Sequence, residues 1–427
     1  MHRCCSQLLP TMIDMSEYEL RGIYKPHFFS IFINGHYDPD LTKLSTQNLG
    51  TFAHEYIHYL QNLTTIFGLR NSVFYFKYLY EVKTHISKNS ELKLPLKDED
   101  LEFPNTLLKG KQAFDQFYGT KEIFSPTYND VKVYLKELPK SNQKMPCLEL
   151  LMNGKVVETV EVGNLCVKEG MAHLFQSFYD PKVEHSTFPY KAVEILCKQL
   201  RPEWLHDKRK LIAACLMSLN SQNSGLTLYE IILNAQTELT GIELYKKLLS
   251  EHIVIHNSKE ITVKEFLLTS IEEFRTALSN SIYAELKHFN RLLDNVKLAV
   301  NQDTCPLIDI LYEYSEIDGL YSLIDFYGIP YIRTIDGYQY FPPDSIDSRE
   351  ENISKELLDL LGQNIVLERV LEISQSSPTC SFYPQCEMDI SDPTDEHCFS
   401  DQWNRTTPCP FLIVSQNWKL QEKIKSG

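Results

Sequence analysis

The chain has 427 residues, 43% of them hydrophobic, and its 57 acidic and 42 basic side chains give a formal net charge of −15. This length and composition predict a folded protein of two or three domains with a sizeable core. The negative charge argues against nucleic acid or an anionic membrane surface as the main partner.

The sequence also argues against membrane insertion and secretion. No apolar run approaches the roughly 18 residues that cross a membrane, and residues 1–6 lack the apolar stretch of a secretory signal. Eleven cysteines are scattered along the chain, and Cys166, Cys197 and Cys215 stand in apolar, helix-like surroundings. Buried thiols in a reducing compartment explain these cysteines better than disulfides do. We therefore expect a cytoplasmic protein.

The first predicted elements are a strand over residues 28–33, ended by the turn signal at 34–35, and a helix that follows it. Ser45 or Thr46 can cap the start of this helix, and Gly68 suits its end. Apolar residues recur at helical spacing and form a stripe that we expect to face the core, namely Phe52, Tyr56, Tyr59, Leu60, Leu63 and Phe67.

The same helix contains His54-Glu55-Tyr56-Ile57-His58, which has the form H-E-x-x-H, and His54, His58, Gln61 and Thr65 fall on a face other than the apolar stripe. The two histidines are one turn apart, so both imidazoles project from one side and can bind a single zinc ion. Glu55 lies between them and can act as the general base on a metal-bound water. The simpler alternative is a partly exposed helix whose polar face carries two histidines.

A catalytic zinc usually takes three protein ligands, and Glu169 is the candidate for the third. It lies in a predicted helix that Asn164 can cap and that ends before Pro181. Glu169, His173 and Gln176 share one face of this helix. The alternative is an ordinary solvated helix face. The opposite, buried stripe consists of Met171, Leu174, Phe175 and Phe178.

The motif His54-Glu55-x-x-His58 followed by Glu169-Gly170-Met171-Ala172 resembles the zincin metallopeptidases, specifically the glutamate-zincin branch. The resemblance implies a zincin-like core, with a small sheet and active-site helices. It further implies that His54, His58 and Glu169 are zinc ligands and that Glu55 is the general base.

The chain departs from the family pattern at two points. The separation between His58 and Glu169 is longer than usual, which requires a large insertion. Thermolysin-like members have an aspartate one turn after the ligand glutamate, where it holds a zinc-binding histidine, and this chain has His173 there. His173 is therefore an alternative third ligand.

Residues 81–163 form the predicted insertion. Asn153-Gly154 separates the apolar run 147–152 from the run 155–162, and this pattern predicts a β-hairpin with a type I′ turn. A hairpin strand that borders the site would allow a peptide to pair with it. A purely structural hairpin is the interpretation that the sequence favours.

Residues 164–300 are predicted to be mostly helical, with long helical periodicity over 263–300. The chain contains no glycine-rich nucleotide-binding motif and no nucleophile elbow. Residues 326–333 and 337–343 are aromatic and rich in turn formers, which indicates short strands or an ordered loop. We expect an α+β fold with a zincin-like catalytic domain over 1–300 and an accessory region over 301–427.

The accessory region contains Cys380, Cys386, Cys398 and Cys409, with His397 beside the third. Four cysteines this close in sequence are candidates for a tetrahedral structural zinc site. Their spacing is irregular and includes no C-x-x-C pair, which weakens that interpretation. The alternative is a set of reduced cysteines in a turn-rich C-terminal cap.

These patterns together predict a zinc-dependent hydrolase, specifically a cytoplasmic metalloendopeptidase that acts on a protein or peptide. Its tetrahedral oxyanion needs a hydrogen-bond donor, for which Tyr190 is favoured over Tyr179, His185 and His206. The first alternative is a catalytically silent binding or scaffold protein with the zincin fold. The second is a metal-dependent amidase that acts on a small molecule.

Overall fold

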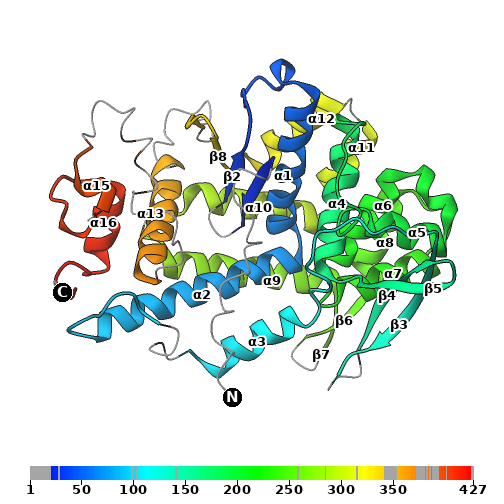
Figure 1. Cartoon of the computed structure of the whole chain (residues 1–427), viewed down its shortest axis with the longest axis horizontal. Coiled ribbons are helices and arrows are strands. Elements are labelled where there is room, and N and C mark those ends of the chain that lie inside the picture. Colours follow the sequence, from blue (N-terminus) through cyan, green and yellow to red (C-terminus); the bar gives the residue numbers. More distant parts are fainter. Residues whose placement is uncertain are drawn as a thin grey trace.

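Helices make up most of this protein, whose structure is a computed structural model (Figure 1). The predictions for residues 1–6, Phe28 and 341–343 lie outside the described residues. None of the described helices combines the length and the apolar character that a membrane crossing requires. The structure describes residues 21–26, 29–97, 101, 103–139, 143–256, 259–283, 285–313, 316–340, 353–371, 380, 383, 386, 394–400 and 402–424.

A small mixed sheet lies at the centre of the described fold. Strands β1 (Gly22–Lys25) and β2 (Ser30–Ile33) are antiparallel, and β2 pairs in parallel with β8 (Tyr331–Thr334). The fourth strand, β9 (Gln339–Tyr340), pairs antiparallel with β8, which gives the order β1-β2-β8-β9. The prediction of an α+β fold is confirmed for the mixture of helices and small sheets. The short strands predicted in segments 326–333 and 337–343 are also confirmed, as β8 and β9.

The sheet joins parts of the chain that are distant in sequence. The predicted domain boundary at residue 300 falls in α10 (Lys287–Asn301), and β8 lies beyond it. Since β8 pairs with β2, residues from both predicted domains build the same sheet. All four residues of β2 are buried, as expected for a strand that has neighbours on both sides.

The predicted H-E-x-x-H helix is α1 (Thr46–Thr64), and α2 (Ile66–Lys88) follows it after one residue. The side chain of Ser45 caps α1 by accepting from the Asn48 amide at 3.2 Å. The prediction that Gly68 ends this helix is wrong. Thr65 has extended backbone geometry, which stops α1, and its Oγ1 accepts from the Gly68 amide at 3.1 Å, which starts α2.

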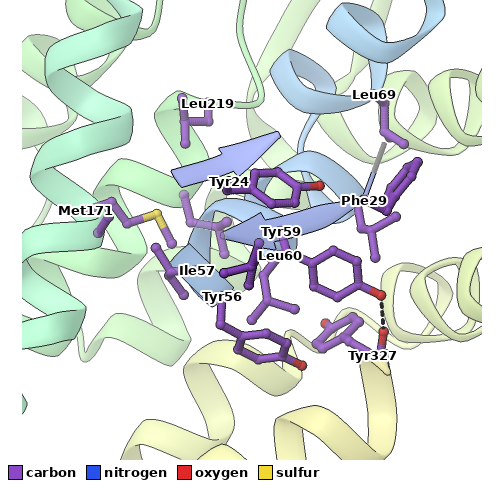
Figure 2. Close-up of a cluster of buried hydrophobic side chains, with 14 of the residues drawn as sticks. Tyr24, Phe29, Tyr56, Ile57, Tyr59, Leu60, Leu69, Met171, Leu219 and Tyr327 are labelled. Atoms are coloured by element: carbon purple, nitrogen blue, oxygen red, sulfur yellow. Dashed lines mark hydrogen bonds between the residues drawn. The ribbon is translucent and has the colours of Figure 1, made fainter. Parts of the chain in front are cut away.

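One face of α1 is fixed to the core by aromatic side chains (Figure 2). Tyr59 donates to the carbonyl oxygen of Tyr327 at 2.7 Å, and Tyr56 donates to that of Gly328 at 2.8 Å. The Tyr59 ring makes edge-to-face contacts with Tyr24 of β1 and with Phe29. These contacts fix the rotation of α1 about its axis, so the opposite face points in a defined direction.

That opposite face of α1 packs against α4 (Asn164–Tyr179), the predicted second helix (Figure 1). The prediction that Asn164 caps α4 is wrong, because Gly163 occupies the cap position and makes no side-chain capping bond. Asn164 instead accepts from the Ser224 amide at 3.0 Å through its side-chain oxygen. This buried bond ties the start of α4 to the start of α7 (Ser224–Asn234).

The predicted hairpin is confirmed as β4 (Lys144–Met152) and β5 (Lys155–Glu161). Asn153 and Gly154 have φ angles of 52° and 77°, as a type I′ turn requires. A third strand, β3 (Asp130–Glu137), pairs with the other side of β4. The predicted insertion from residue 81 therefore begins inside α2 and consists of helix α3 (Asn105–Asp115) and this antiparallel sheet.

The remaining elements surround this core. The long periodicity predicted over residues 263–300 comprises two helices, α9 and α10, and the two-stranded β6-β7 ribbon before them was not predicted. The helices and strands not yet described are α5 (Ala192–Leu200), α6 (Lys208–Ser218), α8 (Gly241–Glu251), β6 (Ile253–His256), β7 (Lys259–Thr262), α9 (Val263–Ser281), α11 (Pro306–Glu313), α12 (Glu316–Tyr327), α13 (Ile353–Leu371), α15 (His397–Ser400) and α16 (Pro410–Asn417). The 3-10 turns are η1 (Leu41–Lys43), η3 (Pro202–His206) and η4 (Gln402–Asn404).

We predict that Tyr59→Phe lowers the free energy of unfolding by about 1–3 kcal/mol, because the buried Tyr327 carbonyl loses its donor. Chemical denaturation followed by circular dichroism measures the change. The control is Tyr80→Phe on α2, whose side chain is exposed. Equal stability of the two variants would show that the Tyr59 bond does not hold α1.

Candidate metal centre

Three potential metal ligands meet where α1 packs against α4. The Nε2 atoms of His54 and His58 lie 3.4 Å and 3.2 Å from Oε2 of Glu169. One ligand atom from each residue lies within 4.8 Å of the others, and all three side chains are buried. The structure therefore brings together the two histidines and the glutamate that the sequence proposed as ligands. The alternative of a partly exposed polar helix face is not what the structure shows.

Two glutamines orient the histidine rings. His54 Nδ1 lies 2.9 Å from Oε1 of Gln176, and His58 Nδ1 lies 2.8 Å from Oε1 of Gln61. The amide of Gln61 is oriented by its Nε2, which donates to the carbonyl oxygen of Lys168 at 3.0 Å. An amide oxygen only accepts, so both Nδ1 atoms carry the hydrogen. Nε2 of each ring then faces Glu169, where it can either donate a proton to the carboxylate or bind a metal ion.

Sequence reasoning placed Gln61 and Gln176 on the ligand faces of the two helices but gave them no role. The signal was their spacing, because Gln61 is three residues after His58 and Gln176 is seven after Glu169. A hydrogen-bond partner on the ring nitrogen that does not bind the metal sets the tautomer and the orientation of a metal-binding histidine. In this chain the partners are neutral amides.

Glu169 is a buried carboxylate surrounded by positive groups. Burial alone would raise its pKa, but the charges of His58 and Lys168 and hydrogen bonds from both histidines hold the pKa well below its ordinary value. Lys168 contributes directly, with Nζ 3.2 Å from Oε1 of Glu169. The carboxylate therefore stays ionised, which is the form that binds a cation.

Glu55 points to the sheet side of the ligand group. A Cβ atom placed on Gly22 would lie 2.9 Å from Oε1 of Glu55, so the carboxylate contacts the backbone of β1. A side chain at position 22 would displace Glu55 from this place. Glu55 therefore lies against the edge strand of the sheet.

Tyr190 lies beside the same group. Its ring stacks on His185 with centroids 4.4 Å apart, and it lies 5.9 Å from the His54 ring. Burial, followed by the negative charges of Glu169 and Glu55, raises the pKa of Tyr190, so its hydroxyl keeps its proton and can donate.

His185 is held in place by the same glutamine as His54. Its Nε2 lies 2.7 Å from Oε1 of Gln176, so this nitrogen also carries a hydrogen. Burial and the nearby His54 and His173 lower the pKa of His185 to about 3. The imidazole is therefore neutral at physiological pH.

The other candidates from the sequence lie further from the ligand atoms. Nε2 of His173, the alternative third ligand, lies 3.5 Å from Oε2 of Glu194, and the histidine is not part of the ligand group. Tyr179 packs on the ring of Phe175 near the end of α4, and His206 ends η3. Of the candidates from the sequence, Glu169 lies with the two histidines, and the rings of both Tyr190 and His185 lie beside the His54 ring.

The four C-terminal cysteines also come together in the fold. Cys380, Cys386, Cys398 and Cys409 are buried and line one small cavity. They are separate from the group on α1 and α4. Comparison of the chain with protein-family models, with curated proteins and with solved structures finds no match.

We predict that Gln176→Leu weakens zinc binding about 10–100-fold, because His54 loses the acceptor that fixes its tautomer. Competition with a chromophoric chelator measures the affinity. Gln47→Leu, at an exposed position in the first turn of α1, is the matched control. An unchanged affinity in Gln176→Leu would mean that the amide does not orient the ring.

Proposed function

We propose that the protein is a zinc-dependent peptidase with a zincin-like core, in which His54, His58 and Glu169 hold the metal. One observation carries this proposal. Two imidazole nitrogens and one carboxylate oxygen converge within 4.8 Å in a buried site. Protons on the imidazoles or a metal ion must offset the repulsion between these electron-rich atoms, and a zinc ion can replace those protons.

The donor set suits zinc. Two imidazole nitrogens and one carboxylate oxygen are a common catalytic zinc environment, and such sites keep one position open. Zinc bound there would lower the pKa of a water ligand and polarise a substrate carbonyl. The presence of Glu55 beside the ligands supports a catalytic site, because a structural site needs no base.

Two side chains have assigned roles in the proposed reaction. Glu55 takes the proton of the attacking water on its carboxylate and then passes it to the nitrogen of the leaving amine. The Tyr190 hydroxyl donates a hydrogen bond to the oxyanion that develops on the former carbonyl oxygen. The stacking of Tyr190 on His185 holds the phenol in position for this bond.

The sheet supports a peptide as the substrate. Within the described residues, β1 is the terminal strand of the sheet and pairs only with β2. Its Gly22 backbone lies against Glu55. An extended peptide that paired with this edge would pass directly beside the proposed base, and its backbone would supply the recognition.

We predict that Glu55→Gln lowers kcat by about 10²–10⁴-fold while zinc stays bound, because the amide cannot accept the proton. Cleavage of casein, peptide libraries and acylated amino acids is followed alongside zinc content by plasma emission. Glu230→Gln, at an exposed position on α7, is the control. Undiminished cleavage by Glu55→Gln would exclude this residue as the base.

The same assays separate the alternatives. A zinc-loaded parent protein that cleaves no substrate supports a binding or scaffold role. Cleavage of acylated amino acids without cleavage of peptides supports an amidase. His54→Ala should lose the metal, and an unchanged zinc content would exclude His54 as a ligand.

We predict that Tyr190→Phe lowers kcat by about 10²–10³-fold with little change in KM or zinc content, since only the donor to the oxyanion is lost. The phenylalanine ring keeps the stack on His185. The control is Tyr338→Phe, at an exposed position. A kcat equal to that of the parent would assign the oxyanion to another donor.

A further inference from the structure

A second cluster of metal-ligating side chains lies in the C-terminal part of the described chain. The cluster combines residues from separate short segments between positions 380 and 411. All four of its cysteines are buried. Their neighbours around the cavity include one charged and two aromatic side chains. The cavity at its centre is lined by Cys380, Tyr383, Cys386, Cys398, Arg405, Cys409, Pro410 and Phe411.

The size of the cavity limits what it can hold. Its volume is about 10 Å³, which is close to that of a single water-sized sphere. No organic ligand or cofactor fits such a space. A single metal ion does.

The charges around the sulfur atoms favour a cation as well. Arg405 is 4% exposed, and its Nη1 donates to Sγ of Cys398 at 2.8 Å. Its Nε lies 3.5 Å from Oδ2 of Asp395, so the guanidinium is placed between a carboxylate and a sulfur. Asp395 balances this guanidinium, and its Oδ1 also lies 3.8 Å from Sγ of Cys398. The N–H of Arg405 directed at this sulfur would stabilise the thiolate form when a metal binds.

The backbone also donates to this cluster. The Leu412 amide donates to Sγ of Cys409 at 3.4 Å, so this sulfur caps the start of α16. The Cys380 amide donates to the carbonyl oxygen of Cys398 at 2.7 Å and ties two of the segments together. N–H donors directed at cysteine sulfur are the outer contacts that stabilise metal-bound thiolates.

We propose that Cys380, Cys386, Cys398 and Cys409 bind one structural zinc ion, distinct from the site formed by α1 and α4. Zinc accepts four thiolates in tetrahedral geometry, with Zn–S distances of about 2.3 Å. Within the described residues, no three of these sulfurs lie within 4.8 Å of one another. Rotation of the side chains into the cavity must therefore close the site when the ion binds.

Such a site would hold the C-terminal segment on the rest of the fold. Helix α16 packs against α13, and Cys409 stands at its first turn. Of the cysteines that precede it, Cys398 lies in α15. A metal that joins all four would add a covalent-strength link to the hydrophobic contacts that already hold this region.

The test measures zinc in the full-length protein. The parent should contain two zinc ions per chain, and a His54→Ala, His58→Ala double variant should retain one. X-ray absorption of that variant should show a shell of sulfur neighbours at about 2.3 Å. A folded double variant that contains no zinc would overturn the proposal, and so would a zinc shell made only of nitrogen and oxygen.

A second pair of variants tests the residues. Cys398→Ser with Cys409→Ser should lose one zinc and keep the ion bound by the histidines. Cys215→Ala, at a buried cysteine of α6, should lose none. If the cysteine variants fail to fold, X-ray absorption of the parent decides, since absence of any zinc–sulfur shell overturns the proposal. Loss of two thiols per chain in the denatured, chelator-treated parent would indicate a disulfide and contradict it.

Discussion

The convergence of two imidazoles and a carboxylate in a buried interior is the constraint on which the proposed active site depends. Positive charge and hydrogen bonds from its neighbours keep Glu169 ionised, and the glutamines turn Nε2 of both imidazoles toward it. Each donor alone is an ordinary buried polar group. Their closeness gives a zinc ion three ligand atoms at one point, which turns a short sequence motif into a specific chemical hypothesis.

The rest of the fold supplies the rigidity that this convergence needs. Helix α1 has one face locked to backbone carbonyls by tyrosine hydroxyls and the other face against α4. A rotation of α1 that displaced His54 would break those buried bonds. The same helix carries Glu55 toward β1, so two of the three proposed ligands and the proposed base lie on one element beside the edge strand.

The features of this arrangement that depend on local sequence spacing could be predicted from the sequence. Those that depend on contacts between distant residues could not. The histidine pair, the aromatic stripe of α1 and the type I′ turn follow from helical periodicity or turn chemistry within a few residues, whereas Glu169 was suggested by its resemblance to a known motif. The end of α1 at Thr64 and the use of Asn164 to bind Ser224 depend on tertiary partners. The role of Gln176 depends on the packing of α4 against α1, which no single-chain pattern reveals.

The pairing of β2 with β8 has a consequence for the order in which the molecule is completed. The proposed ligands and base lie at or before residue 169, but β2 gains its second neighbour only when Tyr331–Thr334 has been synthesised. A chain synthesised only as far as residue 330 would thus present an unsatisfied strand and a loosely supported α1. A proteolytic activity built this way would be withheld from the cell until β8 has been made and paired.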